Sequence, residues 1–179
     1  MMTDMEYHEV YTADGTPTGE VVAKHAPRRK GDYFLHTIVI MKTEDSPAPG
    51  EGEGMYIMQQ RSLKARYYAG RWDVTGGGVR ADETPWEGAV REAFEELGVR
   101  LDVKKLREFH RYRVTWDDGS GLHIFVYACR AKVPENGFII EPSEVNDVKL
   151  APYREFRLHV MDHNDTAFGQ ALSRIEREV

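Results

Sequence analysis

Residues 77–99, GGVRADETPWEGAVREAFEELGV, carry the strongest local signals in this chain. Thr84 is a residue type that caps helix N-termini, and Pro85 suits the first helical turn. Gly98 is the residue type that most often ends a helix. The segment therefore predicts a helix over residues 85–97.

Three glutamates gather on one face of this predicted helix. Glu92, Glu95 and Glu96 are three or four residues apart, and each like-charge pair at such spacings costs roughly 0.2–0.5 kcal/mol. A hard divalent cation such as Mg²⁺ would remove that cost, because carboxylate oxygens are its preferred protein ligands. A solvated acidic face is the alternative interpretation. The opposite, apolar stripe is expected to pack on a sheet and consists of Trp86, Val90, Ala93, Phe94 and Leu97.

The longer spacing pattern decides between these two interpretations. Gly77 is followed by Glu83, then by Arg91-Glu92 and by Glu95-Glu96-Leu97-Gly98-Val99. Average residue frequencies would produce these seven fixed letters and two apolar positions about once in ten million chains. The array resembles the Nudix box, G-x5-E-x7-R-E-U-x-E-E-x-G-U with U apolar, and no required position departs from it.

The resemblance to the Nudix superfamily implies a fold, a reaction and a set of site residues. The fold is α/β, an α/β/α sandwich with a mixed β-sheet and a loop-helix-loop catalytic motif. The reaction is metal-dependent hydrolysis of a nucleoside diphosphate linked to another group, X. By similarity, Mg²⁺ or Mn²⁺ is held by Glu92, Glu95, Glu96 and the carbonyl of Gly76, with Glu92 and Glu95 also catalytic. Glu83 and Arg91 become supporting residues that orient the carboxylates.

Members of the superfamily also recruit a general base from outside the box. Glu144 is our first candidate, because it precedes a predicted strand on a loop that could reach over the metal site. An exposed loop acid is the alternative. Asp117 and Asp118 are reserve candidates, although with Gly119 they are more typical of a hairpin turn.

Substrate contacts are expected from a cationic segment upstream of the box. Arg61, Lys64 and Arg66 lie between two predicted strands and could grip a diphosphate, with a solvated loop as the alternative. The neighbouring aromatic residues could stack on a base or pack at the rim of the sheet; these are Tyr67, Tyr68 and Trp72. His36, His123 and Cys129 are interpreted as structural residues of strands.

The rest of the chain reads as strands followed by helices. We expect an N-terminal hairpin within residues 5–25, an antiparallel pair from 34–42 and 55–61, and a mobile loop over 43–54. A strand over 72–75 should run into a loop at Gly76-Gly77-Gly78. A second hairpin is predicted from 106–116 and 122–131, and a closing strand at 148–150. Residues 153–179 are predicted to be helical, since Phe168, Ala171, Leu172 and Ile175 follow helical spacing.

Composition limits the class of protein further. The 179 residues suit one domain, residues 1–179, and the net charge of −6 argues against binding nucleic acid. No apolar run approaches membrane-spanning length, and a single cysteine excludes an internal disulfide. We therefore expect a cytoplasmic enzyme with a small-molecule diphosphate substrate, no membrane contact and a possible homodimer.

Two other functions remain open on the sequence alone. Gln59 to Lys64 followed by Trp72 resembles the branch that includes isopentenyl-diphosphate isomerase, but no cysteine stands near the glycine run. A nucleotide-sensing module without turnover is the other alternative, although such modules often lack box carboxylates that this chain retains.

Overall fold

The computed structural model describes residues 6–48, 50–160 and 166–179. Within these residues, nine strands form one sheet. The strands are β1 (Tyr7–Tyr11), β2 (Pro17–Ala23), β3 (Tyr33–Thr43), β4 (Met55–Arg61), β5 (Trp72–Asp73), β6 (Thr75–Gly78), β7 (Arg107–Thr115), β8 (Gly121–Ala131) and β9 (Val145–Pro152). The helices are α1 (Pro85–Leu97), α2 (Tyr153–Val160) and α3 (Thr166–Glu178).

Strand β3 is the centre of the sheet. It runs parallel to β8 from Tyr33↔Gly121 to Thr43↔Ala131 and antiparallel to β6. The sheet is therefore mixed, as predicted. The expected pairing of 34–42 with 55–61 is confirmed only at Lys42↔Tyr56, because most of β4 pairs with β9 instead. β9 is longer than the 148–150 segment in the prediction.

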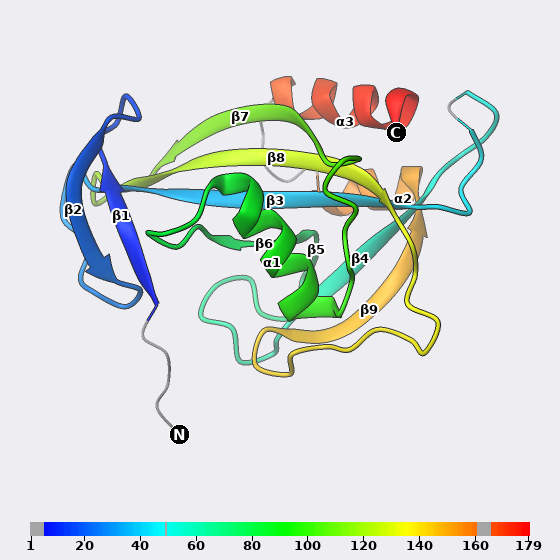
Figure 1. The fold of residues 1–179 in the computed structure, drawn as a ribbon, viewed down its shortest axis with the longest axis horizontal. Coiled ribbons are helices and arrows are strands. Elements are labelled where there is room, and N and C mark those ends of the chain that lie inside the picture. Colours follow the sequence, from blue (N-terminus) through cyan, green and yellow to red (C-terminus); the bar gives the residue numbers. More distant parts are fainter. Residues whose placement is uncertain (1–5, 49, 161–165) are drawn as a thin grey trace.

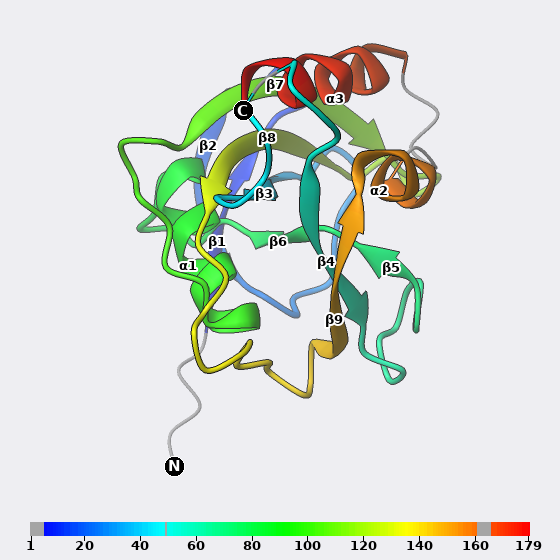
Figure 2. The same ribbon diagram turned by 90° about the vertical axis from the view of Figure 1, so that its right-hand side faces the viewer.

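The helices cover both faces of the sheet. Figure 2 shows α1 on one side of the strands and α2 on the other, while α3 lies beyond β7 in Figure 1. Alternate residues of β3 supply the two cores, as strand geometry requires. Ile38 and Ile40 join the cluster that contains Phe156 and Leu172, whereas Val39 and Met41 join that of α1. The predicted α/β/α sandwich is confirmed.

Helix α1 begins and ends where the sequence predicted. The Thr84 hydroxyl accepts a hydrogen bond from the Glu87 backbone N–H at 3.2 Å, and Glu87 Oε2 accepts from the Thr84 N–H at 2.8 Å. This reciprocal pair is a capping box. Gly98 ends the helix with a left-handed φ of 69°.

The glycine run is strand rather than loop, which corrects the sequence-based expectation. Gly76, Gly77 and Gly78 belong to β6 and pair with β3, and none of them has a positive φ. Their need for glycine is steric: a Cβ on Gly76 would lie 2.3 Å from the backbone oxygen of Thr37. Close approach of the backbone, also anticipated from the sequence, is thus what the run provides.

The buried face of α1 is rotated from the predicted one. Gly88, Ala89, Ala93 and Leu97 face the sheet, and Glu96 is buried with them. Phe94, expected in the core, is 46% exposed and lies under the guanidinium of Arg100. The small residues let the helix approach the sheet closely on one side, which brings Glu96 inward and turns Phe94 outward.

The remaining predictions on elements hold with small shifts. The hairpins β1–β2 and β7–β8 form, and the helical spacing of the C-terminal segment corresponds to buried Phe168, Leu172 and Ile175. Residue 5 of the predicted N-terminal hairpin, residue 49 of the predicted loop and residues 161–165 of the predicted helical segment lie outside the described residues. In the described part of the chain, no helix is both long and apolar enough to cross a membrane.

Candidate active site

Arg91 lies at the centre of the site. Its guanidinium donates to both carboxylate oxygens of Glu83, at 2.6 and 3.0 Å. It also donates to Glu92 Oε1 at 2.8 Å, to Glu95 Oε2 at 2.9 Å and to the Gly78 carbonyl at 3.0 Å. Such a fork holds several glutamates in defined rotamers, and only arginine has this donor geometry.

Glu83 accepts two of the hydrogen bonds that Arg91 donates. Burial alone would raise the pKa of Glu83, but the hydrogen bonds from Arg91 and from the Arg80 N–H outweigh it and lower the pKa. The Arg80 N–H lies 3.2 Å from Glu83 Oε2. Glu83 is therefore a charged anchor that orients Arg91, in keeping with the supporting role that the box implies.

Glu96 is buried between the helix and the glycine strand. Its Oε2 accepts from Gln59 Nε2 at 3.0 Å and from the Gly76 N–H at 3.3 Å. Burial, together with the charge of Glu92, raises the pKa of Glu96 to about 8. The sequence analysis missed Gln59, because nothing near Gln59 in the sequence indicates that β4 faces α1.

Glu92 lies directly over Gly77. A Cβ on Gly77 would be 2.1 Å from Glu92 Oε1, so only glycine leaves room for this carboxylate. Burial raises the pKa of Glu92 despite its contact with Arg91. Glu96 is buried and Glu92 is 14% exposed, and both carboxyl groups have raised pKa values. Their oxygens form a hard donor set that suits a divalent cation.

The carboxylates of Glu92, Glu95 and Glu96 are not gathered around one common point. Among the described residues, no three His, Cys, Asp or Glu side chains are gathered closely enough to hold a metal ion. Glu95 is the most exposed of the three box glutamates, and its two oxygens contact Arg91 at 2.9 Å and Arg80 at 3.3 Å. For Glu95 to bind the same cation as Glu92 and Glu96, its carboxylate would have to move away from Arg91 and Arg80.

Glu87 and Arg80 make contacts that the sequence analysis did not predict. Glu87, four residues before Arg91, bonds Thr84 at the helix cap rather than the arginine. Arg80, which the sequence analysis did not single out, bridges Glu95 and Glu6, with its Nη2 2.7 Å from Glu6 Oε1. No local pattern could reveal Arg80, since Glu6 comes from the distant N-terminal segment.

The candidate general base approaches the site from another loop. Glu144 is exposed, and its charge contributes to the raised pKa of Glu96. Its backbone oxygen accepts from the Ser62 N–H at 2.8 Å, which ties the loop to the end of β4. Asp118 instead accepts from Ser120 in the β7–β8 turn, so the turn interpretation of Asp117 and Asp118 holds.

The three predicted cations differ in their surroundings. Arg61 lines a cavity of about 380 Å³ beside β6, together with Tyr67. Lys64 and Arg66 are exposed on the loop after β4, and Arg66 lies over the Tyr67 ring. Trp72 packs against the core and under Lys149, which supports its packing interpretation.

The residues interpreted as structural divide into two groups. Cys129 is buried and free, as expected, and His123 Nε2 lies 2.9 Å from the Thr12 carbonyl. His36 lines the same cavity as Arg61. Burial and the nearby charge of Arg61 lower its pKa to about 4, so that His36 is neutral at pH 7.

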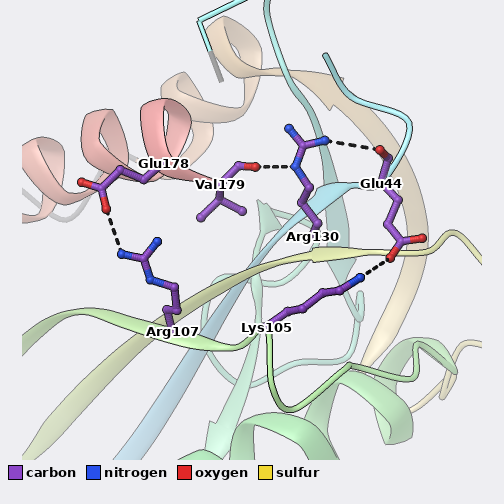
Figure 3. A pocket seen from close by; sticks show the side chains of 6 residues that line it. All are labelled: Glu44, Lys105, Arg107, Arg130, Glu178 and Val179. Atoms are coloured by element: carbon purple, nitrogen blue, oxygen red, sulfur yellow. Dashed lines mark hydrogen bonds and ion pairs between the residues drawn. The ribbon is translucent and has the colours of Figure 1, made fainter. Parts of the chain in front are cut away.

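A second cavity, of about 540 Å³, lies near the end of α3. Figure 3 shows that its cations already have partners: Lys105 contacts Glu44, Arg107 contacts Glu178, and Arg130 contacts Val179. This charge balance distinguishes it from the cavity at Arg61.

Comparisons with known proteins agree with this geometry. A family model described as the NUDIX domain matches residues 36–172. Nudix hydrolase 3 of Arabidopsis thaliana is 28% identical over 174 residues, covering 91% of this chain but 21% of the plant protein. An uncharacterized Nudix hydrolase of Rhodococcus erythropolis is 29% identical over 174 residues, covering 87% of this chain and 89% of that protein.

Solved structures show the same fold. A protein of Deinococcus radiodurans superposes with a TM-score of 0.66 at 17% identity, over 95% of this chain and 99% of that one. The NUDIX domain of Shewanella oneidensis NrtR, solved with ADP ribose, superposes with a TM-score of 0.60 at 18% identity, over 84% and 91%. The family model, the fold and the complete box agree, and the chain belongs to the Nudix superfamily.

Proposed function

We propose that the protein is a hydrolase that uses Mg²⁺ or Mn²⁺ to cleave the pyrophosphate bond of a nucleoside diphosphate linked to a group X, or of a related compound. Membership of the Nudix superfamily supports pyrophosphate-bond hydrolysis in general. The observation that carries the proposal for this chain is the pair formed by buried Glu96 and partly buried Glu92, which lies against β6 beside the fork of Arg91.

The metal ligands in this proposal are Glu92, Glu95, Glu96 and the carbonyl of Gly76. Glu92 and Glu96 have raised pKa values because burial disfavours their charge, and a cation between them would favour the ionised forms. The chemistry that a divalent cation supplies when bound is neutralisation of phosphate charge and activation of water.

The other site residues are proposed to position the metal ligands, to remove a proton from the attacking water and to contact the diphosphate. Arg91, anchored by Glu83, sets the rotamers of Glu92 and Glu95, and Gln59 orients Glu96. Glu144 is the proposed general base: its carboxylate takes a proton from the water whose oxygen attacks phosphorus, while the bridging P–O bond breaks in line. Arg61, with Lys64 and Arg66 on the following loop, is proposed to contact the diphosphate.

The test is turnover on a panel of substrates. Hydrolysis products would be separated by chromatography and measured as nucleoside monophosphate, phosphorylated X, pyrophosphate or phosphate. The panel consists of nucleoside di- and triphosphates, nucleotide sugars, dinucleotides and isopentenyl diphosphate, each with Mg²⁺, with Mn²⁺ and with EDTA. We expect metal-dependent release that Glu96→Gln lowers at least about 100-fold, which exceeds the effect typical of supporting residues. Glu87→Gln is the matched control, because Glu87 lies on the same helix but only caps it.

Two outcomes would contradict hydrolysis. Tight binding of one nucleotide without turnover of any panel member would identify a sensing module. Rearrangement of isopentenyl diphosphate without phosphate release would identify an isomerase.

A further inference from the structure

Thr37 lies within β3, on the face of the sheet that α1 covers. Helix α1 packs against both β3 and β6 (Figure 1). The Thr37 side chain is buried, and its methyl carbon Cγ2 lies 3.7 Å from the position that a Cβ on Gly88 of α1 would take. Thr37 is therefore enclosed between the sheet and the helix that carries the box.

The hydroxyl of Thr37 has no hydrogen-bond partner within the part of the chain that the structure describes. A buried polar atom without a partner destabilises a folded protein, and most such atoms in native structures are bonded. Valine would fill the same space without that cost. The hydroxyl, rather than the shape of the side chain, is thus the feature that calls for an explanation.

The nearest group that could use this hydroxyl lies across the sheet ladder. Thr37 is paired with Gly77 of antiparallel β6. Side chains of such a pair point to the same face, with their Cβ atoms about 4.5–5.5 Å apart. At Gly77 that position is taken by Glu92, because the three nearest atoms to a Cβ there would be those of the Glu92 carboxyl group. Glu92 therefore stands where the cross-strand neighbour of Thr37 would be.

The Glu92 carboxylate has acceptor capacity to spare. Its Oε1 accepts from Arg91 at 2.8 Å, and no other group of the described residues donates to it. An ionised carboxylate offers roughly four lone-pair sites, of which Arg91 uses one and a bound cation would use another. A donor without an acceptor and an acceptor with unused sites thus lie side by side between β3, β6 and α1.

We propose that Thr37 is a positioning residue of the metal site: its hydroxyl donates a hydrogen bond, directly or through one enclosed water, to the Glu92 carboxylate that binds the cation. The inference rests on the proposed function, because it takes Glu92 as a metal ligand. Arg91 then holds Glu92 from the helix and Thr37 holds it from the sheet. A hydrogen bond to a charged acceptor is stronger than one between neutral groups, so the contact favours the ionised, metal-binding form.

The experiment measures binding of Mn²⁺ to the full chain by calorimetry, without substrate, for the parent protein and two variants. Thr37→Val keeps the shape of the side chain and removes the hydroxyl, so it should weaken Mn²⁺ binding about tenfold or more. Thr37→Ser keeps the hydroxyl and removes the methyl group. It should therefore retain most of the parent affinity.

Thermal unfolding in EDTA should rank the two variants in the opposite order. Thr37→Val should unfold at the parent temperature or above it, because an unpartnered polar atom leaves the interior. Thr37→Ser should unfold about 2–4 °C lower, because it leaves a space beside Gly88. A residue that only fills space between β3 and α1 would depend on its methyl group in both measurements.

The matched control is Thr43→Val, the same substitution at the last residue of β3. Thr43 is also buried, but its hydroxyl lies 3.0 Å from Ser46 Oγ. It is six residues from Thr37, or about 20 Å along the strand. Its loss should lower the unfolding temperature and leave the Mn²⁺ affinity unchanged.

Two results would overturn the inference alone. One is a Thr37→Val protein that binds Mn²⁺ as tightly as a parent that binds it. The other is an equal loss of affinity in the valine and serine variants, since the hydroxyl would then not be what matters.

The remaining results separate the inference from the proposed function. A parent protein that does not bind Mn²⁺ would overturn both. Mn²⁺ binding that depends on the Thr37 hydroxyl, without turnover of any substrate, would support the inference and refute the proposed hydrolysis.

Discussion

At the scale of single residues, Arg91 links more of the candidate site than any one carboxylate does. It contacts Glu83, Glu92, Glu95 and the Gly78 carbonyl. Arg91→Lys keeps the charge but loses the fork, so the glutamates should lose their fixed rotamers. We expect metal affinity and turnover to fall about 10- to 100-fold. A Mg²⁺ titration of activity measures this, and an unchanged midpoint in the lysine variant would refute the positioning role.

Glu6 connects the N-terminal segment to the box loop through two cations. Lys24 and Arg80 each lie 2.7 Å from its carboxylate. Burial would raise the pKa of Glu6, but hydrogen bonds from both cations outweigh it and lower the pKa to about 2. Because the folded-state pKa is below the unfolded value, this contribution to stability is complete above about pH 4.5 and is lost as the pH falls toward 2.

The variant Glu6→Gln tests this linkage. The free energy of unfolding at pH 7 should fall by about 0.5–1 kcal/mol, as expected for a largely surface ion pair. Between pH 4.5 and 2 the stability of the variant should decline less steeply than that of the parent. Urea denaturation across this range measures both effects, and parallel declines would contradict the assignment.

At the scale of elements, strand β6 places two glycines against different kinds of atom. A Cβ on Gly76 would lie 2.3 Å from the Thr37 backbone oxygen, whereas one on Gly77 would lie 2.1 Å from a Glu92 side-chain oxygen. Backbone cannot move aside, so Gly76→Ala should destabilise the fold by about 1–3 kcal/mol. A side-chain end can move, so Gly77→Ala should stay folded and lose activity by displacing Glu92.

Urea denaturation and turnover assays on the two variants distinguish these effects. Each variant acts as the control for the other, since both add one methyl group to the same strand. A Gly77→Ala protein with full activity would show that the placement of Glu92 over Gly77 does not matter to turnover.

At the scale of the whole molecule, the two faces of the sheet differ in role. The face covered by α1 carries the candidate active site, and the opposite core contributes to stability. Helix α3 packs on the core opposite α1, and its Leu172 is 1% exposed. Leu172→Ala should therefore lower the free energy of unfolding by about 2–5 kcal/mol. The variant protein that does fold should keep the KM of the parent protein, because α1 packs in the other core. Arg177→Ala, an exposed change on the same helix, is the control; a large change in KM alone would contradict this division.

Much of the candidate site could be predicted because its signals are local. The cap at Thr84, the stop at Gly98 and the spacing of Glu92, Glu95 and Glu96 all lie within one helix. The nearly continuous run of apolar and β-branched residues in β3 likewise predicts a strand covered on both faces. Helix geometry alone relates side chains three and four residues apart, so these features follow without knowledge of the rest of the chain.

The chain by itself therefore determined the Nudix box and its helix, because those depend on short-range spacing and capping, and the resemblance that the box carries implied the layered fold. Only the tertiary structure decided that Glu96 is buried against Gln59, that Arg80 reaches Glu6, and which residues line the cavity. Arg28, Arg61 and Trp116 come from three separate segments. Their proximity depends on sheet pairing over long sequence separations, and hydrophobic packing of two cores sets that pairing rather than any local pattern.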